Sequence, residues 1–283
     1  MRTDTPWLTQ PGALERLGTA DPLVPHQVVR WEHGAPTERL DMVAEECPVT
    51  IVYNDVPHVV MMATPTNLID FVTGFSLTEG LVRSVDDITS IAAVPHARGI
   101  EMQVTVAAAC MAEIEGRTRR ISGRTGCGVC GSESVDAVLR PVPAVGPGRE
   151  VSGRVIHRAL DQLVARQDLN RQAGAVHAAG WSSYEGDVDL VREDVGRHNA
   201  LDKLIGALRT RGTDPQSGFV VVTSRASFEM VHKAAMLGTS LLVTVSGATG
   251  LAVRMAHEAN LTLCGFSRGE SHVVYTHAWR VVA

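Results

Sequence analysis

The sequence predicts an α/β fold, and two patterns in its second half support that prediction. Runs of apolar residues at 219–223, 241–245 and 261–266 are typical of strands that are buried on both faces. These runs alternate with segments whose apolar residues recur at helical spacing. Strands that alternate with amphipathic helices indicate a parallel sheet covered by helices on both faces, which is a three-layer α-β-α domain. The chain of 283 residues is long enough for this domain and a smaller one.

The first half predicts a smaller N-terminal α+β domain over residues 26–115, preceded by a flexible tail over residues 1–25 that is rich in Pro, Gly and Thr. Runs of β-branched residues predict its strands, and Asn54 and Asp55 predict a hairpin turn between two of them. Thr64 and Pro65 are typical of a helix start. The expected elements are strands at 28–31, 49–53, 56–62, 88–94 and 102–107, and a helix from Thr64 to about Gly80.

Residues 116–150 are expected to form a mobile loop and a linker. The stretch 116–131 holds four arginines, five glycines and a Cys-x-x-Cys pair, and long loops of this kind are usually functional. The α/β domain is expected over residues 151–283. Its expected helices lie at 153–167, 201–208, 226–237 and 252–259, and its expected strands at 178–183, 188–192, 219–223, 241–245, 261–266 and 273–276.

Composition excludes several classes of function. Lys and Arg number 26 against 31 Asp and Glu, and the resulting charge of −5 argues against a general nucleic-acid binder. The N-terminus lacks the apolar core of a signal peptide, and small polar residues interrupt the uncharged stretch 234–253, so we expect neither an export signal nor a membrane span. The five cysteines are therefore expected to stay reduced in the cytoplasm.

Three loops that follow predicted strands have a chemistry suited to an anion. They cover residues 224–227, 246–250 and 267–271, and all three combine hydroxyl side chains with small residues. Ligands of α/β sheets bind beyond the carboxyl ends of strands, where free N–H groups favour phosphate, and Arg225 and Arg268 add positive charge. Ordinary caps and turns would explain any one loop, but three in one sheet favour an anionic ligand. No loop matches Walker A or G-x-G-x-x-G, so we expect a nucleotide-like ligand held in an unusual way.

Two other polar features remain open. The run from Glu193 to Asn199 carries more charged and polar side chains than a helix cap requires. His177 stands at the start of a predicted buried strand, and by itself this position is more typical of a hydrogen-bonded core histidine than of a functional one.

The pair Cys127 and Cys130 has four possible interpretations. Structural zinc normally needs four ligands, and no second pair is visible. A zinc deaminase needs H-x-E with P-C-x-x-C, and none of the eleven histidines has Glu two positions on. A thioredoxin-like pair should begin a helix in a βαβ unit, whereas this one lies in a loop rich in Gly and Arg. Sulfur transfer needs an exposed thiolate on a mobile loop, and nearby positive charge favours the thiolate form. That charge would come from Arg117, Arg119, Arg120 and Arg124.

Several long motifs resemble the FdhD family of formate dehydrogenase accessory sulfurtransferases. They are TGCGVCG at 125–131, EDVGRHNALDKLIG at 193–206, SRASFEMVHKAAMLG at 224–238, GFSRGESHVVYTH at 265–277 and VMMATPTNLIDFVTGFSLTEG at 60–80. The resemblance covers residues 26–280. It implies a cytidine-deaminase-like C-terminal domain without zinc, in agreement with the missing zinc signature.

The resemblance implies a sulfur carrier that takes sulfur from a cysteine desulfurase. It would deliver the sulfur to the bis-guanine-dinucleotide form of the molybdenum cofactor, for formate dehydrogenase. Cys127 is the implied persulfide cysteine, Cys130 would assist or resolve, and a homodimer without a side-chain metal site is expected. The implied cofactor contacts are Phe266, Ser267, Arg268, Gly269, Glu270 and Ser271, the last standing where many relatives carry Arg; Arg225, Ser246 and His177 are further candidates.

Two alternatives remain: a molybdenum-cofactor chaperone whose cysteines are incidental, and a thiol–disulfide oxidoreductase that cycles a Cys127–Cys130 disulfide. In each case Cys47, Cys110 and Cys264 are most simply core residues.

Overall fold

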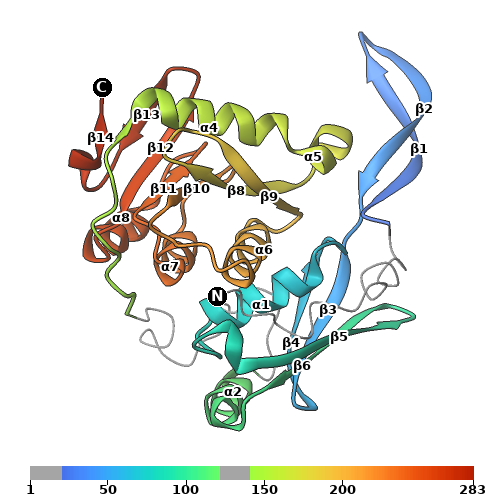
Figure 1. The fold of residues 1–283 in the computed structure, drawn as a ribbon. Helices are drawn as coiled ribbons and strands as arrows, with labels where there is room; N and C mark the ends of the chain where they lie inside the picture. The colour runs from blue at the N-terminus through green and yellow to red at the C-terminus, as the bar shows by residue number, and fades with distance from the viewer. Residues whose placement is uncertain (1–20, 122–140) are drawn as a thin grey trace.

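The computed structural model describes residues 21–121 and 141–283, without the side chains of 117–121. A six-stranded sheet in the order β13-β12-β11-β10-β8-β9 forms the centre of its second half (Figure 1). The strands are β8 (His177–Ser183), β9 (Val188–Asp194), β10 (Gly218–Val222), β11 (Leu241–Thr244), β12 (Thr262–Arg268) and β13 (Ser271–Val274).

This sheet is mixed rather than parallel. β10 pairs with β11 and β11 with β12 in parallel, but β8 runs antiparallel to both β10 and β9, and β13 runs antiparallel to β12. Residues 184–187 alone join β8 to β9, and residues 269–270 join β12 to β13. A parallel crossover needs a dozen or more residues, so such short connections make hairpins. The predicted parallel arrangement was therefore right for β10, β11 and β12 and wrong for the others.

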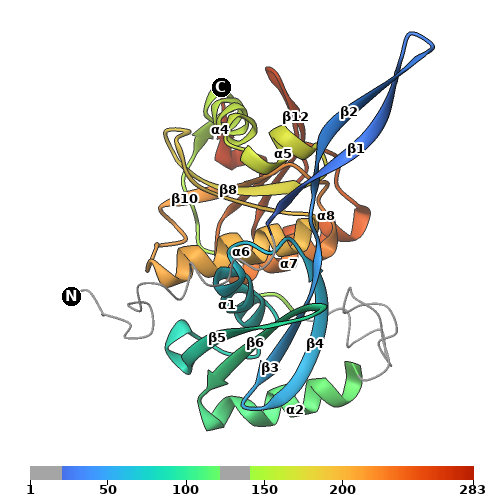
Figure 2. The same ribbon diagram turned by 90° about the vertical axis from the view of Figure 1, so that its right-hand side faces the viewer.

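The sheet lies between two layers of helices, as predicted (Figure 2). Val220 and Val222 of β10 pack with one set of helices, whereas Phe219 and Val221 pack with α4. Because successive side chains of a strand point to opposite faces, the two sets of helices cover opposite faces of the sheet. One layer holds α4 (Gly153–Ala165), followed by α5 (Asp168–Ala173); the other holds α6 (Arg197–Thr210), α7 (Phe228–Leu237) and α8 (Gly250–Glu258).

No helix within residues 21–121 and 141–283 is long and apolar enough to cross a membrane. The uncharged stretch 234–253 instead spans the end of α7, strand β11 and the start of α8.

The first half forms a second sheet, in the order β4-β3-β6-β5. The predicted hairpin turn at Asn54 and Asp55 is confirmed, and both residues have positive φ angles, of 43° and 67°. Two helices complete the core of this unit (Figure 1). Its elements are β3 (Cys47–Tyr53), β4 (Val56–Ala63), α1 (Leu68–Thr78), β5 (Ile88–His96), β6 (Gly99–Val106) and α2 (Ala108–Ile121).

Two parts of the first half differ from the expectation. Residues 116–121 belong to α2 rather than to a loop, because Ala108, Ala109 and Met111 are strong helix formers and Ile114 is buried in the core. Residues 23–44 form a long hairpin arm of β1 (Leu23–Glu32) and β2 (Ala35–Ala44), which extends away from the body (Figure 2). The tail expected to end at residue 25 therefore overlaps β1, and the strand β2 was not expected.

Helices α1 and α6 join the two halves through backbone contact. A Cβ atom at Gly74 of α1 would lie 1.8 Å from the carbonyl oxygen of Asp202, and one at Gly206 of α6 would lie 1.9 Å from that of Asp70. No side chain fits between the helices at this crossing, so both positions require glycine.

Buried polar groups reinforce the same junction. The backbone N–H of Thr64 donates to Asp194, and the fully buried Lys203 ammonium lies 2.7 Å from Asp194 and donates to the carbonyl oxygen of Thr64. Asp202 accepts hydrogen bonds from Lys233 and from Thr78 of α1. Burial alone would lower the pKa of Lys233, but the charges of Asp202 and Glu79 raise it instead, so Lys233 stays cationic. These bonds hold the two halves in one fixed arrangement.

Candidate functional site

The three predicted anion loops lie together at one edge of the sheet. They follow β10, β11 and β12, and the first two pair through a bridge between Ala226 and Ala248. The third joins them because the backbone N–H of Phe266 donates to the carbonyl oxygen of Ser246, at 3.1 Å. The carboxyl ends of three neighbouring parallel strands therefore form one surface, as the sequence indicated.

Phe266 is the most unusual residue of this surface. It has a φ of 51°, in the left-handed region that bulky residues rarely adopt, and its side chain is 54% exposed. The ring packs over Gly247, where a Cβ atom would lie 2.7 Å from Cζ of Phe266. A register shift between Gly265 and Arg268 creates this geometry. Strained residues of this type cluster at ligand sites, and the exposed ring offers a flat apolar face.

The segment from Phe266 to Ser271 is a strand–turn–strand rather than a loop. Arg268 ends β12, Gly269 and Glu270 form the turn, and Ser271 begins β13. No helix follows, so the helix-dipole argument does not apply to this segment. Ser267 is only 1% exposed, and its hydroxyl group has no hydrogen-bond partner among the described residues.

Helix N-termini border the other two loops. Ser227 is the N-cap residue of α7, yet its side chain makes no capping bond and its buried hydroxyl group lacks a partner in the described part of the chain. Thr249 caps α8 by accepting a hydrogen bond from the backbone N–H of Ala252. Arg225 and Arg268 are exposed, and neither guanidinium pairs with a carboxylate within residues 21–116 and 141–283. Free N–H groups, a free hydroxyl group and two unpaired guanidiniums suit a phosphate.

His177 lies at the same edge, because it starts β8 beside the carboxyl end of β10. The ring is half-buried, and burial together with the charges of Arg197 and His198 lowers the pKa of His177. His198 contacts Glu229 of α7 at 2.9 Å. Burial alone would raise the pKa of Glu229, but the bond and charge from His198, with the charge of Arg197, lower it. The side-chain Nε of Arg197 is buried without a described partner, so this cluster also has spare hydrogen-bonding capacity.

The rest of the polar run is structural. Glu193 accepts hydrogen bonds from the backbone N–H groups of Leu169 and Asn170 at the start of α5. Asp194 forms the buried ion pair with Lys203, and Asn199 donates to the carbonyl oxygen of Met62. Sequence spacing could not show this, because the partners at residues 62–64 lie about 130 residues earlier in the chain.

The predicted sulfur-carrying residues Cys127 and Cys130 lie outside the described residues. The other three cysteines are poor thiolates. Burial raises the pKa of Cys264 to about 12, and it also raises those of Cys47 and Cys110. Cys264 is fully buried, and Cys47 and Cys110 pack partly buried against the N-terminal core, which confirms that they are packing residues.

Comparisons with known proteins agree with the motif resemblance. The family model described as the FdhD/NarQ family matches residues 44–282. "Sulfur carrier protein FdhD" of Cupriavidus necator is 48% identical over 254 residues, covering 90% of this chain and 88% of that protein. The protein of the same name from Xanthomonas axonopodis pv. citri is 49% identical, with 90% of each chain covered.

A solved structure shares the fold. A crystal structure of a protein described as a formate dehydrogenase accessory protein, from Desulfotalea psychrophila, superimposes with a TM-score of 0.72. The match covers 93% of this chain and 100% of that chain at 22% identity. At this identity it supports the similarity of the fold and nothing more specific. The family model and the two close relatives place the chain more specifically: it belongs to the FdhD/NarQ family.

Proposed function

We propose that this chain is a sulfur carrier that receives sulfur from a cysteine desulfurase and delivers it to a molybdenum cofactor carrying two guanine dinucleotides, for use by formate dehydrogenase. The observation that supports this most is the surface made by the loops after β10, β11 and β12. It combines the exposed Phe266 ring with the Arg225 and Arg268 guanidiniums and the hydroxyl groups of Ser227 and Ser267, none of which has a partner in the part of the chain that the structure describes.

The base and the phosphates of a guanine nucleotide would each have a counterpart in this surface. The guanine base would stack on Phe266, since aromatic side chains stack on bases of any kind. The phosphates would bind Arg225, Arg268 and the N–H groups at the start of α7, where the helix dipole favours negative charge. Ser246 and His177 lie at the same edge and complete the set of proposed contacts.

Sulfur transfer would use Cys127 and Cys130. The Cys127 thiolate would attack the terminal sulfur of the desulfurase persulfide, so that one S–S bond forms as another breaks and the desulfurase cysteine leaves as a thiolate. The persulfide would persist until the acceptor is bound; attack of Cys130 on the inner sulfur of the Cys127 persulfide would then transfer the outer sulfur to the acceptor at the sulfide oxidation level and leave a Cys127–Cys130 disulfide. The two cysteines would thus supply both electrons that reduce the sulfur, and a thiol reductant would restore them.

A mass spectrum of the protein after incubation with a cysteine desulfurase and cysteine tests this role. We expect the protein to gain one sulfur atom, and Cys127→Ala to gain none. Cys110→Ala is the matched control, because Cys110 is half-buried and a poor thiolate. A wild-type protein that gains no sulfur, or a Cys127→Ala variant that gains as much as wild type, refutes the persulfide role.

The other partners in the proposal are also testable. We place the exchange in the cytoplasm and expect a homodimer, which light scattering of the purified chain measures directly. A Cys127→Ala, Cys130→Ala double variant that still restores formate dehydrogenase activity would favour a cofactor chaperone instead.

A further inference from the structure

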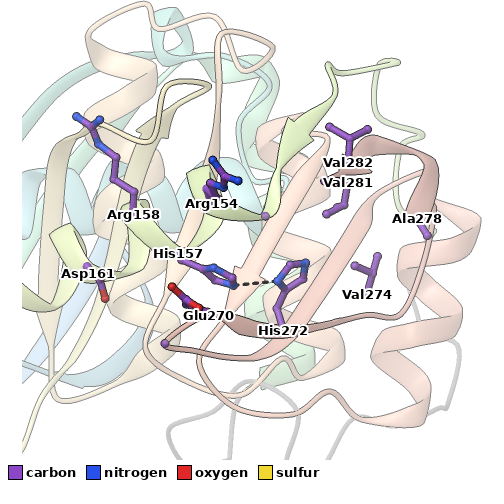
Figure 3. A pocket seen from close by; sticks show the side chains of 13 residues that line it. Arg154, His157, Arg158, Asp161, Glu270, His272, Val274, Ala278, Val281 and Val282 are labelled. Atoms are coloured by element: carbon purple, nitrogen blue, oxygen red, sulfur yellow. Dashed lines mark hydrogen bonds between the residues drawn. The ribbon is translucent and has the colours of Figure 1, made fainter.

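A cavity of about 1010 Å³ lies on the α4 side of the sheet (Figure 3). Three parts of the chain line it: the first turns of α4, the β12–β13 turn with β13, and the C-terminal residues 278–283. Gly269 and Glu270 of the proposed cofactor segment belong to this lining. The segment from Phe266 to Ser271 thus reaches from the loop edge of the sheet to this cavity on the α4 side.

Two histidines meet in this cavity, one from each side. Nε2 of His157 on α4 lies 3.0 Å from Nδ1 of His272 on β13, which directly follows Ser271. Their ring centroids are 5.0 Å apart at an interplanar angle of 63°. The His272 ring also packs on the start of α4, because a Cβ atom at Gly153 would lie 3.0 Å from its Cε1. The hairpin that carries the cofactor segment is thus fastened to α4 by this pair.

The inner part of the hairpin is well held, because β12 also pairs with β11 and the backbone N–H of Tyr275 donates to the carbonyl oxygen of Leu263. Strand pairing is sparse in its outer part, beyond Gly265. β13 is four residues long, and its pairing with β12 is interrupted by the register shift between Gly265 and Arg268. Only the pair Arg268 and Ser271 continues the ladder beyond this shift. Beyond the shift a single pair of residues leaves the end of the hairpin weakly held by the sheet, so contacts with α4 contribute to its position.

We infer that His157 is a positioning residue for the segment from Phe266 to Ser271: through its hydrogen bond to His272 it holds the β12–β13 hairpin against α4, and protonation of both imidazoles releases this hold. The functional consequence rests on the proposed binding of a guanine nucleotide by that segment. The docking itself does not depend on the ligand.

The chemistry of the pair explains why the second proton matters. A hydrogen bond between two imidazoles needs one nitrogen that carries a proton and one that does not. A first added proton keeps the bond, because an imidazolium donates well to a neutral imidazole. A second proton removes the acceptor and places two positive charges side by side. Burial and the neighbouring His157 already lower the pKa of His272, so this step requires acidic conditions.

Other charged groups surround the pair. Arg154 and Arg158 on α4 oppose further protonation, although Arg158 is engaged by Asp187. The carboxylates of Asp161 on α4 and of Glu270 line the same cavity (Figure 3), and their negative charge acts in the opposite direction. The chain's last residue, Ala283, also lines the cavity. The lowered pKa of His272 places the release of the hairpin on the acidic side of the ordinary histidine range.

The test measures guanosine diphosphate affinity by calorimetry between about pH 7.5 and 5.5, with hydrogen exchange of the β12–β13 amides over the same range. We expect the wild-type protein to bind about fivefold more weakly at the acidic end, equivalent to about 1 kcal/mol, with exchange of the hairpin amides rising in parallel. His157→Gln can still donate a hydrogen bond but does not titrate, so it should bind as wild type near neutrality and lose the part of the pH dependence that comes from the histidine pair, while any part due to His177 in the proposed site remains. His257→Gln is the matched control, because His257 stacks on His277 instead.

Two outcomes overturn the inference: a His157→Gln variant with the pH dependence of wild type, or hairpin amides whose exchange does not change with pH. NMR of the histidine ring nitrogens in the wild-type protein tests the inference without a variant. It follows the protonation of His157 and His272, and the inference requires that hydrogen exchange of the hairpin amides accelerates at the pH where the second imidazole becomes protonated. If the nucleotide binds at no pH, the proposed nucleotide site fails, while exchange and NMR still decide whether His157 positions the hairpin.

Discussion

Replacing Gly74 by alanine tests whether the α1–α6 crossing fixes the arrangement of the two halves. The added Cβ atom would lie 1.8 Å from the carbonyl oxygen of Asp202, whereas ordinary contact begins at 3.4 Å. The two backbones must therefore separate by roughly 1.6 Å, the difference between these distances. Asp202 also holds Lys233 and Thr78 through its carboxylate, so this shift strains a buried polar cluster as well.

The magnitude follows from three contributions. Overpacking costs about 1–3 kcal/mol, and weakening a buried, charge-assisted hydrogen bond costs about 1–3 kcal/mol more. Alanine in place of glycine within a helix stabilises the folded state by about 0.5–1 kcal/mol, which offsets part of this cost. We therefore expect Gly74→Ala to lower the free energy of unfolding by about 1–5 kcal/mol, with a midpoint near about 3 kcal/mol, which is a large part of the stability of a typical protein.

Denaturant unfolding followed by circular dichroism measures this loss. Gly116→Ala is the matched control, because Gly116 is also within a helix but an added Cβ atom there would have nothing within 4 Å; this variant should be neutral or slightly stabilising. A Gly74→Ala variant within about 0.5 kcal/mol of wild type would show that the helices separate freely and that the junction is not rigid.

Three further predictions address the buried charges and the site. Lys203→Met should lower the free energy of unfolding by about 3–5 kcal/mol, because it leaves the fully buried Asp194 carboxylate unpaired; adding Asp194→Asn should recover part of this loss in denaturant melts, and no recovery would contradict the pairing. Phe266→Ala should weaken guanosine diphosphate binding by about 1–3 kcal/mol in calorimetry while Phe266→Trp retains it, and equal affinity of all three proteins would exclude stacking. The free energy of unfolding should fall as the pH drops below about 6.5, since the lowered pKa of His177 makes the unfolded chain bind protons more readily than the folded one; the fall should be shallower in His177→Gln than in wild type, and identical slopes would be inconsistent with this assignment.

Local patterns predicted most of the α/β architecture. Apolar runs and helical periodicity correctly gave the strands of the larger sheet, helices α1, α4, α6, α7 and α8, and the two helical layers around that sheet, but they missed α2, α5 and β2. Strand direction was missed because a buried strand such as β8 has the same apolar pattern in either direction. The length of the connection carries that information: residues 184–187 are too few for a crossover, and this signal was available in the sequence.

The turn of the β1–β2 arm could also have been predicted from the sequence. His33 and Gly34 form its turn with φ angles of 51° and 83°, and a residue pair ending in Gly is typical of such hairpins. Most of the arm is exposed, however, so its strands lack the alternation that marks a half-buried sheet.

The candidate site was predictable where it depends on local chemistry. Loops that follow strands must meet at one edge of the sheet, so Arg225, Ser246 and Phe266 could be grouped in advance. The structural role of Asp194 could not be predicted from the sequence, because its partner Thr64 is distant in the chain and becomes a neighbour only when α1 packs on α6. The contact between His157 and His272 is also long-range, because the two positions are 115 apart in the sequence.

The junction between the halves has a consequence for fragments of this protein. Its glycine crossing and its buried hydrogen bonds lie between residues 62–79 and 192–233, so they do not require a continuous backbone between Ile121 and Pro141. Two separately produced polypeptides, cut within that interval, should recognise each other and assemble without a covalent link. The connecting stretch that holds Cys127 and Cys130 is then free to be lengthened, shortened or exchanged, while the scaffold on either side reassembles unchanged.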